Sequence, residues 1–129
     1  MDLILTVTLN PAIDRTVSAD RLVFEDRSYI LSSTEAAGGR GLIASQVLHA
    51  FGASTLAIAP SGGHAGEQLH AYLAGSFYPF ELVPIARSIR TNLIITDKQG
   101  LTVKLNEPGP ELSPEELSRM EQAVCKHLD

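Results

Sequence analysis

The chain has 129 residues, of which 44% are hydrophobic and 19% charged, and its formal net charge is −5. This length and composition are typical of one globular domain with a buried core. The negative charge argues against a nucleic-acid partner, because nucleic-acid-binding domains present a basic surface.

The first predicted element is a core strand over residues 3–9, an apolar and β-branched run. It delivers Asn10, Pro11 and Asp14 to its C-terminal end. In open α/β sheets, ligands bind in the crevice outside the carboxyl ends of the strands. Asp14 is therefore a candidate ligand-binding carboxylate. The alternative is a structural turn residue, since Asx residues are common in turns.

The polar stretch that follows is predicted to hold two short strands, 16–18 and 28–31, joined by a charged connection. A glycine cluster at residues 38–41 then opens a helix. Glycines allow a ligand to approach the backbone amides closely, and amides at a helix N-terminus favour acceptor atoms. A plain tight turn is the commoner explanation of such a cluster.

The helix after the glycine cluster is predicted to end near Gly52, a plausible left-handed stop. Ile43, Val47 and Phe51 repeat at i, i+4 and i+8 along it. This spacing predicts that these three side chains form the buried face of the helix.

The remaining elements alternate between strands and helices. Their predicted ranges are a strand over 55–59, a helix over 66–73, a strand over 81–85 and a hairpin of strands over 92–96 and 101–105. Ser113 as N-cap, Pro114 at N1 and Glu116 at N3 predict the start of a final helix. The apolar face of this helix is predicted to comprise Leu117, Met120, Val124 and Leu128.

The pattern predicts one α/β domain over residues 1–129, in which β excursions within 15–33 and 92–105 interrupt the αβ alternation. Cys125 is the only cysteine, so an internal disulfide is impossible, as is typical of the reducing cytoplasm. No apolar run reaches the roughly 18 residues that a membrane span needs. Asp2 stands where a signal peptide would carry basic residues. We expect a cytoplasmic protein with no membrane partner.

Arginines are the candidates for binding an anionic ligand, because the guanidinium offers a planar donor fork that matches phosphate oxygens. Arg27, Arg87 and Arg90 are weighed for this role, although most surface arginines do nothing specific. The four histidines show no metal-ligand spacing with one another or with cysteine, so no metal site is assigned.

Two segments carry a family resemblance. Thr8-Leu9-Asn10-Pro11-Ala12-Ile13-Asp14 and the later Ala37-Gly38-Gly39-Arg40-Gly41 resemble the PfkB (ribokinase-like) carbohydrate kinases. The closest branch is that of 1-phosphofructokinase and tagatose-6-phosphate kinase. The resemblance implies a partial ribokinase-like three-layer α/β fold. It also implies that the two β excursions form a small β-sheet lid, which in several members is a dimer surface.

The resemblance also assigns roles to single residues. It implies that the sugar is oriented by Asp14, Gly38, Gly39 and Asn92. Arg90-Thr91-Asn92 matches the family's R-x-N entry to the second lid strand, which makes Arg90 the favoured phosphate ligand, with Arg27 in the first excursion as a second. Arg40, which stands where the family usually has lysine, is also predicted to be a substrate-binding residue. Ile43 stands where the family has a sugar-binding asparagine, and isoleucine can neither donate nor accept a hydrogen bond.

The family's catalytic base and anion hole belong to a C-terminal G-A-G-D motif. The sequence contains neither this motif nor a P-loop, so no catalytic residue is assigned. ATP and Mg²⁺ are expected as cofactors by resemblance alone, with their binding residues mostly absent. The chain is predicted to be the N-terminal portion of a kinase for fructose 1-phosphate or tagatose 6-phosphate, and inactive by itself. We expect a homodimer through the lid strands. The alternative is a non-catalytic module that binds a sugar phosphate or mediates dimerisation.

Overall fold

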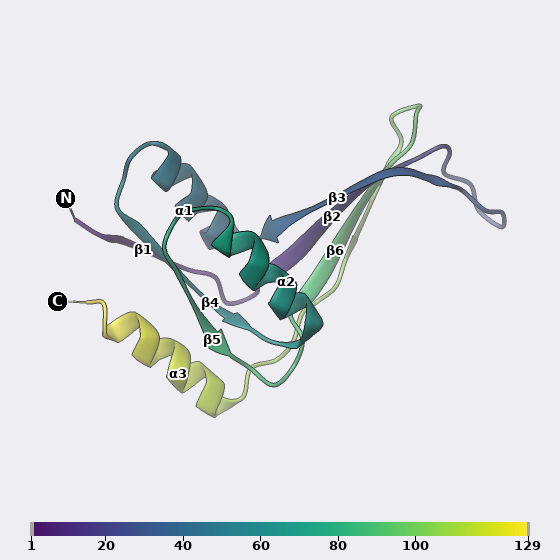
Figure 1. Cartoon of the computed structure of the whole chain (residues 1–129). Coiled ribbons are helices and arrows are strands. Elements are labelled where there is room, and N and C mark those ends of the chain that lie inside the picture. The colour runs from purple at the N-terminus through teal and green to yellow at the C-terminus, as the bar shows by residue number, and fades with distance from the viewer. Residues whose placement is uncertain (1, 129) are drawn as a thin grey trace.

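The computed structural model describes residues 2–128 (Figure 1). The core sheet is parallel, with strand order β1-β4-β5, and comprises β1 (Ile4–Val7), β4 (Thr55–Ser61) and β5 (Phe80–Pro84). The outer sheet has the order β3-β2-β6-β7 and comprises β2 (Ala12–Ala19), β3 (Ile30–Gly38), β6 (Arg90–Thr96) and β7 (Thr102–Asn106). The helices are α1 (Arg40–Ala50), α2 (Gly63–Ala74) and α3 (Pro114–Cys125). No helix in the described part of the chain has the length and hydropathy that a bilayer crossing requires.

Helices cover both faces of the core sheet. Ala57 of β4 packs in one buried cluster with Leu42 of α1 and Leu69 of α2. Ile58, the next residue, packs in a second cluster with Met120 of α3. Successive side chains of a strand point to opposite faces, so α1 and α2 lie on one face of the sheet and α3 on the other. The predicted three-layer α/β fold is confirmed.

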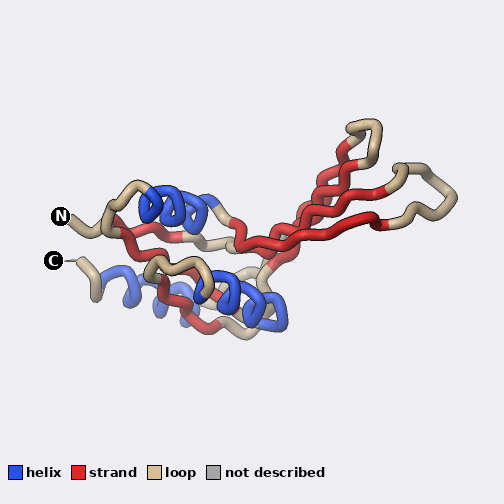
Figure 2. The backbone as a smooth tube through the Cα atoms, turned by 45° about the horizontal axis from the view of Figure 1, so that its top comes forward, coloured by secondary structure: helices blue, strands red, loops and turns tan. Residues whose placement is uncertain are grey.

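The outer sheet extends away from these three layers (Figures 1 and 2). Its centre is the parallel pair of β2 and β6, and β3 and β7 pair antiparallel on either side. Its strands reach beyond the predicted excursions, because pairing of β2 with β6 already begins at Ala12 and Arg90. Two segments that are far apart in sequence therefore share one sheet.

The two faces of the outer sheet differ in chemistry. Partner residues in neighbouring strands share a face, and residues two apart in one strand share it too. The polar face carries Asp14, Thr16, Arg90, Asn92 and Lys104. The apolar face carries Val17, Leu93, Ile95, Val103 and Leu105, and the Arg15–Glu35 ion pair, 3.1 Å apart, interrupts it.

The first strand is shorter than predicted, and Asp14 does not lie in the turn at its exit. β1 ends at Val7, and the Thr8 N–H makes one further bond to the Ile58 carbonyl at 3.0 Å. Pro11 has no N–H to continue the pairing, and the chain enters the outer sheet at Ala12. Asp14 is consequently the third residue of β2.

The helix α1 contradicts the predicted buried face. Ile43, Val47 and Phe51 are 48%, 50% and 87% exposed. The helix instead buries Leu42 and Ser45. A periodic apolar pattern identifies a helix, but it does not show which face the rest of the fold covers.

A hydroxyl network explains why a serine faces the sheet. The Ser45 hydroxyl lies 2.6 Å from that of Thr6 in β1 and 2.9 Å from that of Thr55 in β4. The Thr55 hydroxyl in turn donates to the Ile4 carbonyl at 3.0 Å. Buried polar groups are tolerated when they are hydrogen-bonded, so the small polar side chain allows α1 to approach β1 and β4 closely.

The predicted start of α3 is confirmed in detail. The Glu116 N–H donates to the Ser113 hydroxyl at 3.1 Å, and Glu116 Oε1 accepts from the Ser113 N–H at 2.8 Å. Glu116 Oε2 also accepts from the Ala86 N–H at 2.7 Å, which ties the helix to the segment after β5. The apolar face is confirmed only in part, since Met120 is buried whereas Leu117 is exposed.

Glu116→Gln is expected to destabilise the protein at neutral pH but not in acid. The Ser113 and Ala86 N–H groups hold the pKa of Glu116 below its usual range. A depressed folded-state pKa contributes stability above the unfolded-state pKa, and this contribution is lost as the pH falls through the folded-state pKa. The gap in free energy of unfolding between wild type and variant should therefore close between neutral pH and strong acid, as followed by urea unfolding.

Glu115→Gln is the matched control, because Glu115 lies in the same first turn of α3 and is exposed. Its effect should be small at every pH. A gap for Glu116→Gln that does not depend on pH would contradict the assigned role of the carboxylate.

Candidate functional site

The polar face of the outer sheet brings together two of the predicted site residues. The register of β2 and β6 places Asp14 opposite Asn92. The Asn92 amide donates to Asp14 Oδ1 at 3.2 Å, which orients the carboxylate. Asn92 Oδ1 is buried and has no hydrogen-bond partner among the described residues. The pair therefore holds an oriented carboxylate beside an acceptor that lacks a donor.

Gly38 is required beside this carboxylate for steric reasons. A Cβ on Gly38 would collide with both carboxylate oxygens of Asp14. Gly39 has φ of +122°, in the region that favours glycine, and it is the single residue between β3 and α1. The glycine cluster does open a helix, but it forms no loop of its own, because Gly38 belongs to β3 and Arg40 already to α1.

Arg90 lies on the same face of β6 as Asn92, two residues earlier. Its guanidinium Nε is buried and has no partner in the described part of the chain. Arg90 also lines a cavity of about 330 Å³ together with Arg87, Ser88, Glu107 and Gly109. Two arginines against the single carboxylate of Glu107 leave a net positive charge at this cavity in a chain whose net charge is negative, as an anionic ligand requires.

Asn10 and Thr8 are additional candidates that the sequence analysis did not single out. The Asn10 amide donates to the Pro108 carbonyl at 2.9 Å, and a Cβ on Gly109 would collide with the Asn10 side chain. Asn10 therefore holds the linker after β7 against the site. The Asn10 Oδ1 and the Thr8 hydroxyl are both buried without a partner among residues 2–128.

Unpartnered buried polar atoms concentrate around this site. Five such side-chain atoms occur in the described residues, and four of them belong to Thr8, Asn10, Arg90 and Asn92. Buried polar groups without partners are unfavourable and are rare in native proteins. Their concentration here indicates a place where a polar ligand or ordered water completes the hydrogen bonding.

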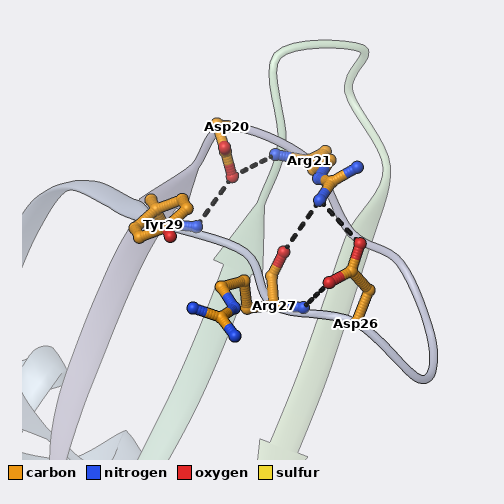
Figure 3. Close-up of polar contacts among 5 residues, drawn as sticks. All are labelled: Asp20, Arg21, Asp26, Arg27 and Tyr29. Atoms are coloured by element: carbon orange, nitrogen blue, oxygen red, sulfur yellow. Dashed lines mark hydrogen bonds and ion pairs between the residues drawn. The ribbon is translucent and has the colours of Figure 1, made fainter.

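Within one chain, Arg27 lies far from the site. It lies in the loop between β2 and β3, at the far end of the outer sheet (Figures 1 and 3). At about 3.3 Å per residue, the stretch of β2 from Asp14 to Ala19 alone spans on the order of 16 Å. Arg40, the first residue of α1, is exposed. The roles of Arg27 and Arg40 stay predictions.

The loop that carries Arg27 is held by its own polar contacts (Figure 3). Asp20 Oδ1 accepts from the backbone N–H groups of Tyr29 and Arg21, both at 2.8 Å. These bonds, chiefly that from Tyr29, hold the pKa of Asp20 below its usual range. The Arg21 side chain donates to Asp26 at 2.9 Å and to the Arg27 carbonyl at 3.2 Å. These bonds give the loop a defined shape. Arg27 takes part in them through its backbone, and its guanidinium does not.

The described residues contain no cluster of metal-ligating side chains. No group of three or more His, Cys, Asp or Glu residues among residues 2–128 could hold a metal ion. The described residues therefore contain no ready-made cage of protein ligands, and no chemical step is assigned to Mg²⁺ here.

Comparison with known proteins relates the chain to sugar kinases. No family model matches it. It is 31% identical over 111 residues to ATP-dependent 6-phosphofructokinase isozyme 2 of Mycobacterium tuberculosis, a match that covers 85% of this chain and 33% of the relative. The chain therefore spans about a third of the length of the curated relatives that it matches.

Solved structures agree with this relation. Phosphofructokinase-2 from Escherichia coli in complex with fructose-6-phosphate superposes with a TM-score of 0.91 and 28% identity, over 98% of this chain and 42% of that one. A possible 1-phosphofructokinase from Thermotoga maritima gives a TM-score of 0.83 and 26% identity, over 95% of this chain and 40% of that one.

The fold is therefore that of part of a ribokinase-like carbohydrate kinase. Its homologues and structural neighbours are phosphofructokinase-2, of the PfkB family, and 1-phosphofructokinase-like kinases, of which the chain covers 33–42%. The predicted family and partial fold are confirmed.

Proposed function

We propose that the chain is the N-terminal part of an ATP-dependent sugar-phosphate kinase and supplies the sugar-binding side of its active site. One observation carries this proposal. The hydrogen-bonded Asp14–Asn92 pair and Arg90 share one face of the outer sheet, with unpartnered buried polar atoms beside them. The predicted substrates are fructose 1-phosphate and tagatose 6-phosphate. We add fructose 6-phosphate as a third candidate substrate, since Escherichia coli phosphofructokinase-2 binds it.

The chemistry of the three side chains suits such a ligand. An ionised carboxylate accepts two hydrogen bonds in a fixed geometry, which fits a pair of sugar hydroxyls at Asp14. The amide of Asn92 can donate to a third polar atom or keep the carboxylate oriented. The guanidinium of Arg90 offers parallel donors to a phosphate group. Residues two apart on a strand lie about 6.6 Å from each other, so Arg90 and Asn92 can contact separate groups of one hexose phosphate.

Transfer of the phosphoryl group needs catalytic groups and nucleotide ligands that are not identified among the described residues. Phosphoryl transfer requires an orienting base for the attacking hydroxyl and donors for the phosphates of ATP. We assign both, with the ATP and Mg²⁺ sites, to the part of the kinase outside this chain. The cytoplasmic location stays a prediction.

Titration of the isotope-labelled chain with fructose 6-phosphate tests the sugar site. The expected result is a shift of the Asn92 side-chain amide signals, together with the backbone signals of Gly38 and Arg90. Fructose is the matched control, because it lacks the phosphate and should shift the Arg90 signals far less. Shifts confined to other regions, or none with any phosphosugar, would contradict the proposal.

A second role, dimerisation, is favoured by the apolar face of the outer sheet. Val103 and Leu105 are exposed on β7, and Leu93 and Ile95 beside them are only half-buried. A small sheet with an uncovered apolar face is stable only marginally in water. We propose that a second copy covers this face and that the outer sheet serves as a lid over the sugar.

Val103→Asp is expected to convert a dimer into a monomer, because it places a carboxylate on the face that the second copy would cover. Sedimentation velocity at concentrations on the order of tens of micromolar measures the change. Lys104→Asp is the matched control, since Lys104 is the adjacent residue and lies on the polar face. A wild-type chain that sediments as a monomer would contradict dimerisation, as would equal effects of the two variants.

A further inference from the structure

The cavity of about 330 Å³ beside Arg90 has two main walls. One wall is the segment 87–91, which leads into β6 and contributes Arg87 and Arg90. The other is the segment 107–110, which follows β7 and is called the linker wall below. The linker wall consists of one glutamate, two prolines and one glycine. Apart from the Glu107 carboxylate, it can therefore offer a ligand only backbone groups.

The linker wall is fixed at two points. Glu107 Oε1 accepts from the Thr91 N–H at 2.6 Å, which ties the wall to the start of β6. The Asn10 side-chain amide donates to the Pro108 carbonyl at 2.9 Å, which ties the wall to the segment after β1. Pro108 and Pro110 have a fixed φ and stiffen the chain between these points. The backbone of the linker wall therefore has a defined orientation before any ligand binds.

The bond from Asn10 fixes the direction of one backbone donor in the linker wall. The Pro108–Gly109 peptide is trans, so its carbonyl and its N–H point to opposite sides. Since the carbonyl points to Asn10, the Gly109 N–H points away from Asn10. The backbone at Gly109 agrees with this direction. A Cβ there would collide with the Asn10 side chain, and at a φ of +86° the N–H lies on the other side of the N–Cα bond.

The Gly109 N–H is available to a ligand. Pro108 and Pro110 have no N–H, so it is the one backbone donor of residues 108–110. Within residues 2–128, no backbone carbonyl accepts a hydrogen bond from it. Gly109 lines the cavity, whereas Asn10 does not. The direction away from Asn10 is therefore the direction of the cavity.

We propose that the Gly109 N–H donates to the phosphate group of the sugar phosphate, and that Asn10 is the positioning residue that aims it. A phosphate monoester presents three acceptor oxygens, and the donor fork of Arg90 can bind two of them. A backbone N–H on the opposite wall suits the third oxygen, since backbone amides in concave sites bind anions. The inference rests on the proposed sugar-phosphate site. It goes beyond that site in assigning a second phosphate donor and the residue that orients it.

Titration of the isotope-labelled chain with fructose 6-phosphate tests the donor by nuclear magnetic resonance. The Gly109 amide proton signal is expected to move downfield and to saturate together with the Arg90 signals, because a hydrogen bond to an anion deshields the proton. Inorganic phosphate should produce the same downfield shift at higher concentrations, since it lacks the sugar contacts. Fructose is the control ligand and should leave the Gly109 signal unchanged, because it carries no phosphate.

Asn10→Leu tests the aiming role, because leucine keeps the approximate shape of asparagine without its donor and adds no charge. The dissociation constant for fructose 6-phosphate should rise roughly tenfold, as expected when one bond to a charged group is lost. The Gly109 shift should disappear while the Arg90 shift remains, a split that general destabilisation would not produce. Gln99→Leu is the matched control: it replaces an exposed amide side chain in the turn between β6 and β7 and should change neither shift.

The contrary outcomes are separable. A wild-type shift at Arg90 without one at Gly109 would overturn this inference and leave the proposed sugar-phosphate site standing, whereas no shift at either residue would overturn both. Equal Gly109 shifts with fructose and fructose 6-phosphate would mean that the N–H faces a sugar hydroxyl. An unchanged Gly109 shift in Asn10→Leu, or equal loss of both shifts, would refute the aiming role. Protection of the Thr8 amide from hydrogen exchange, through its bond to Ile58, shows that the variant is folded.

Discussion

Replacing Asp14 by alanine is expected to lower kcat/KM roughly ten- to hundredfold for both fructose 6-phosphate and fructose. The assay uses Escherichia coli phosphofructokinase-2 in which this chain replaces the matching segment. The reason is that the carboxylate accepts from sugar hydroxyls, which both substrates share. A hydrogen bond to a charged group contributes about 1.5–3 kcal/mol, which corresponds to such a loss when it is removed.

Two further variants test whether the carboxylate itself is responsible. Asp2→Ala removes an exposed carboxylate near the start of the chain and should leave kcat/KM unchanged. Gly38→Ala should reproduce much of the loss, because the added Cβ would displace the Asp14 carboxylate while the backbone at Gly38 needs no left-handed φ. Full activity of Gly38→Ala together with an inactive Asp14→Ala would contradict the close packing that the structure shows.

Replacing Arg90 by alanine is expected to separate the two substrates. The value of kcat/KM for fructose 6-phosphate should fall roughly ten- to hundredfold, because the charge-assisted bonds to the phosphate are lost. The value for fructose should change little, since fructose carries no phosphate. The measurement is kcat/KM for both substrates, with the same Escherichia coli phosphofructokinase-2 in which this chain replaces the matching segment.

Arg87→Ala is the comparison for this result. Arg87 lines the same cavity but is exposed, whereas Arg90 is half-buried and has an unpartnered Nε. Its loss should be much smaller than that of Arg90→Ala. Equal losses from both variants would mean that the cavity attracts phosphate by its overall charge. Equal losses of Arg90→Ala on the two substrates would make Arg90 a structural residue.

The sequence by itself determined the features that depend on near neighbours. The start of α3 follows from Ser113, Pro114 and Glu116, whose capping bonds close within four residues. The hairpin of β6 and β7 follows from alternating strands around Gly100, which has φ of +89°. The family resemblance followed from short motifs, since such motifs can be recognised in the sequence without knowledge of where their elements lie in space.

Only the tertiary structure decided which faces are covered and which distant residues meet. Asp14 and Asn92 are separated by 78 residues and meet through the register of β2 and β6. The spacing of Ile43, Val47 and Phe51 predicted a helix correctly, but the face that α1 buries was set by Ser45 and its partners on two strands.

The roles of Asn10 and Thr8 illustrate the same limit. Nothing in the local sequence shows that the Asn10 amide binds the Pro108 carbonyl, 98 residues later, or that the Thr8 hydroxyl lies beneath the glycines that open α1. The periodicity of apolar residues shows only which side chains of a segment lie on the same face of its helix or strand. Burial, and with it an unpartnered polar atom, depends on what the rest of the chain places against that segment.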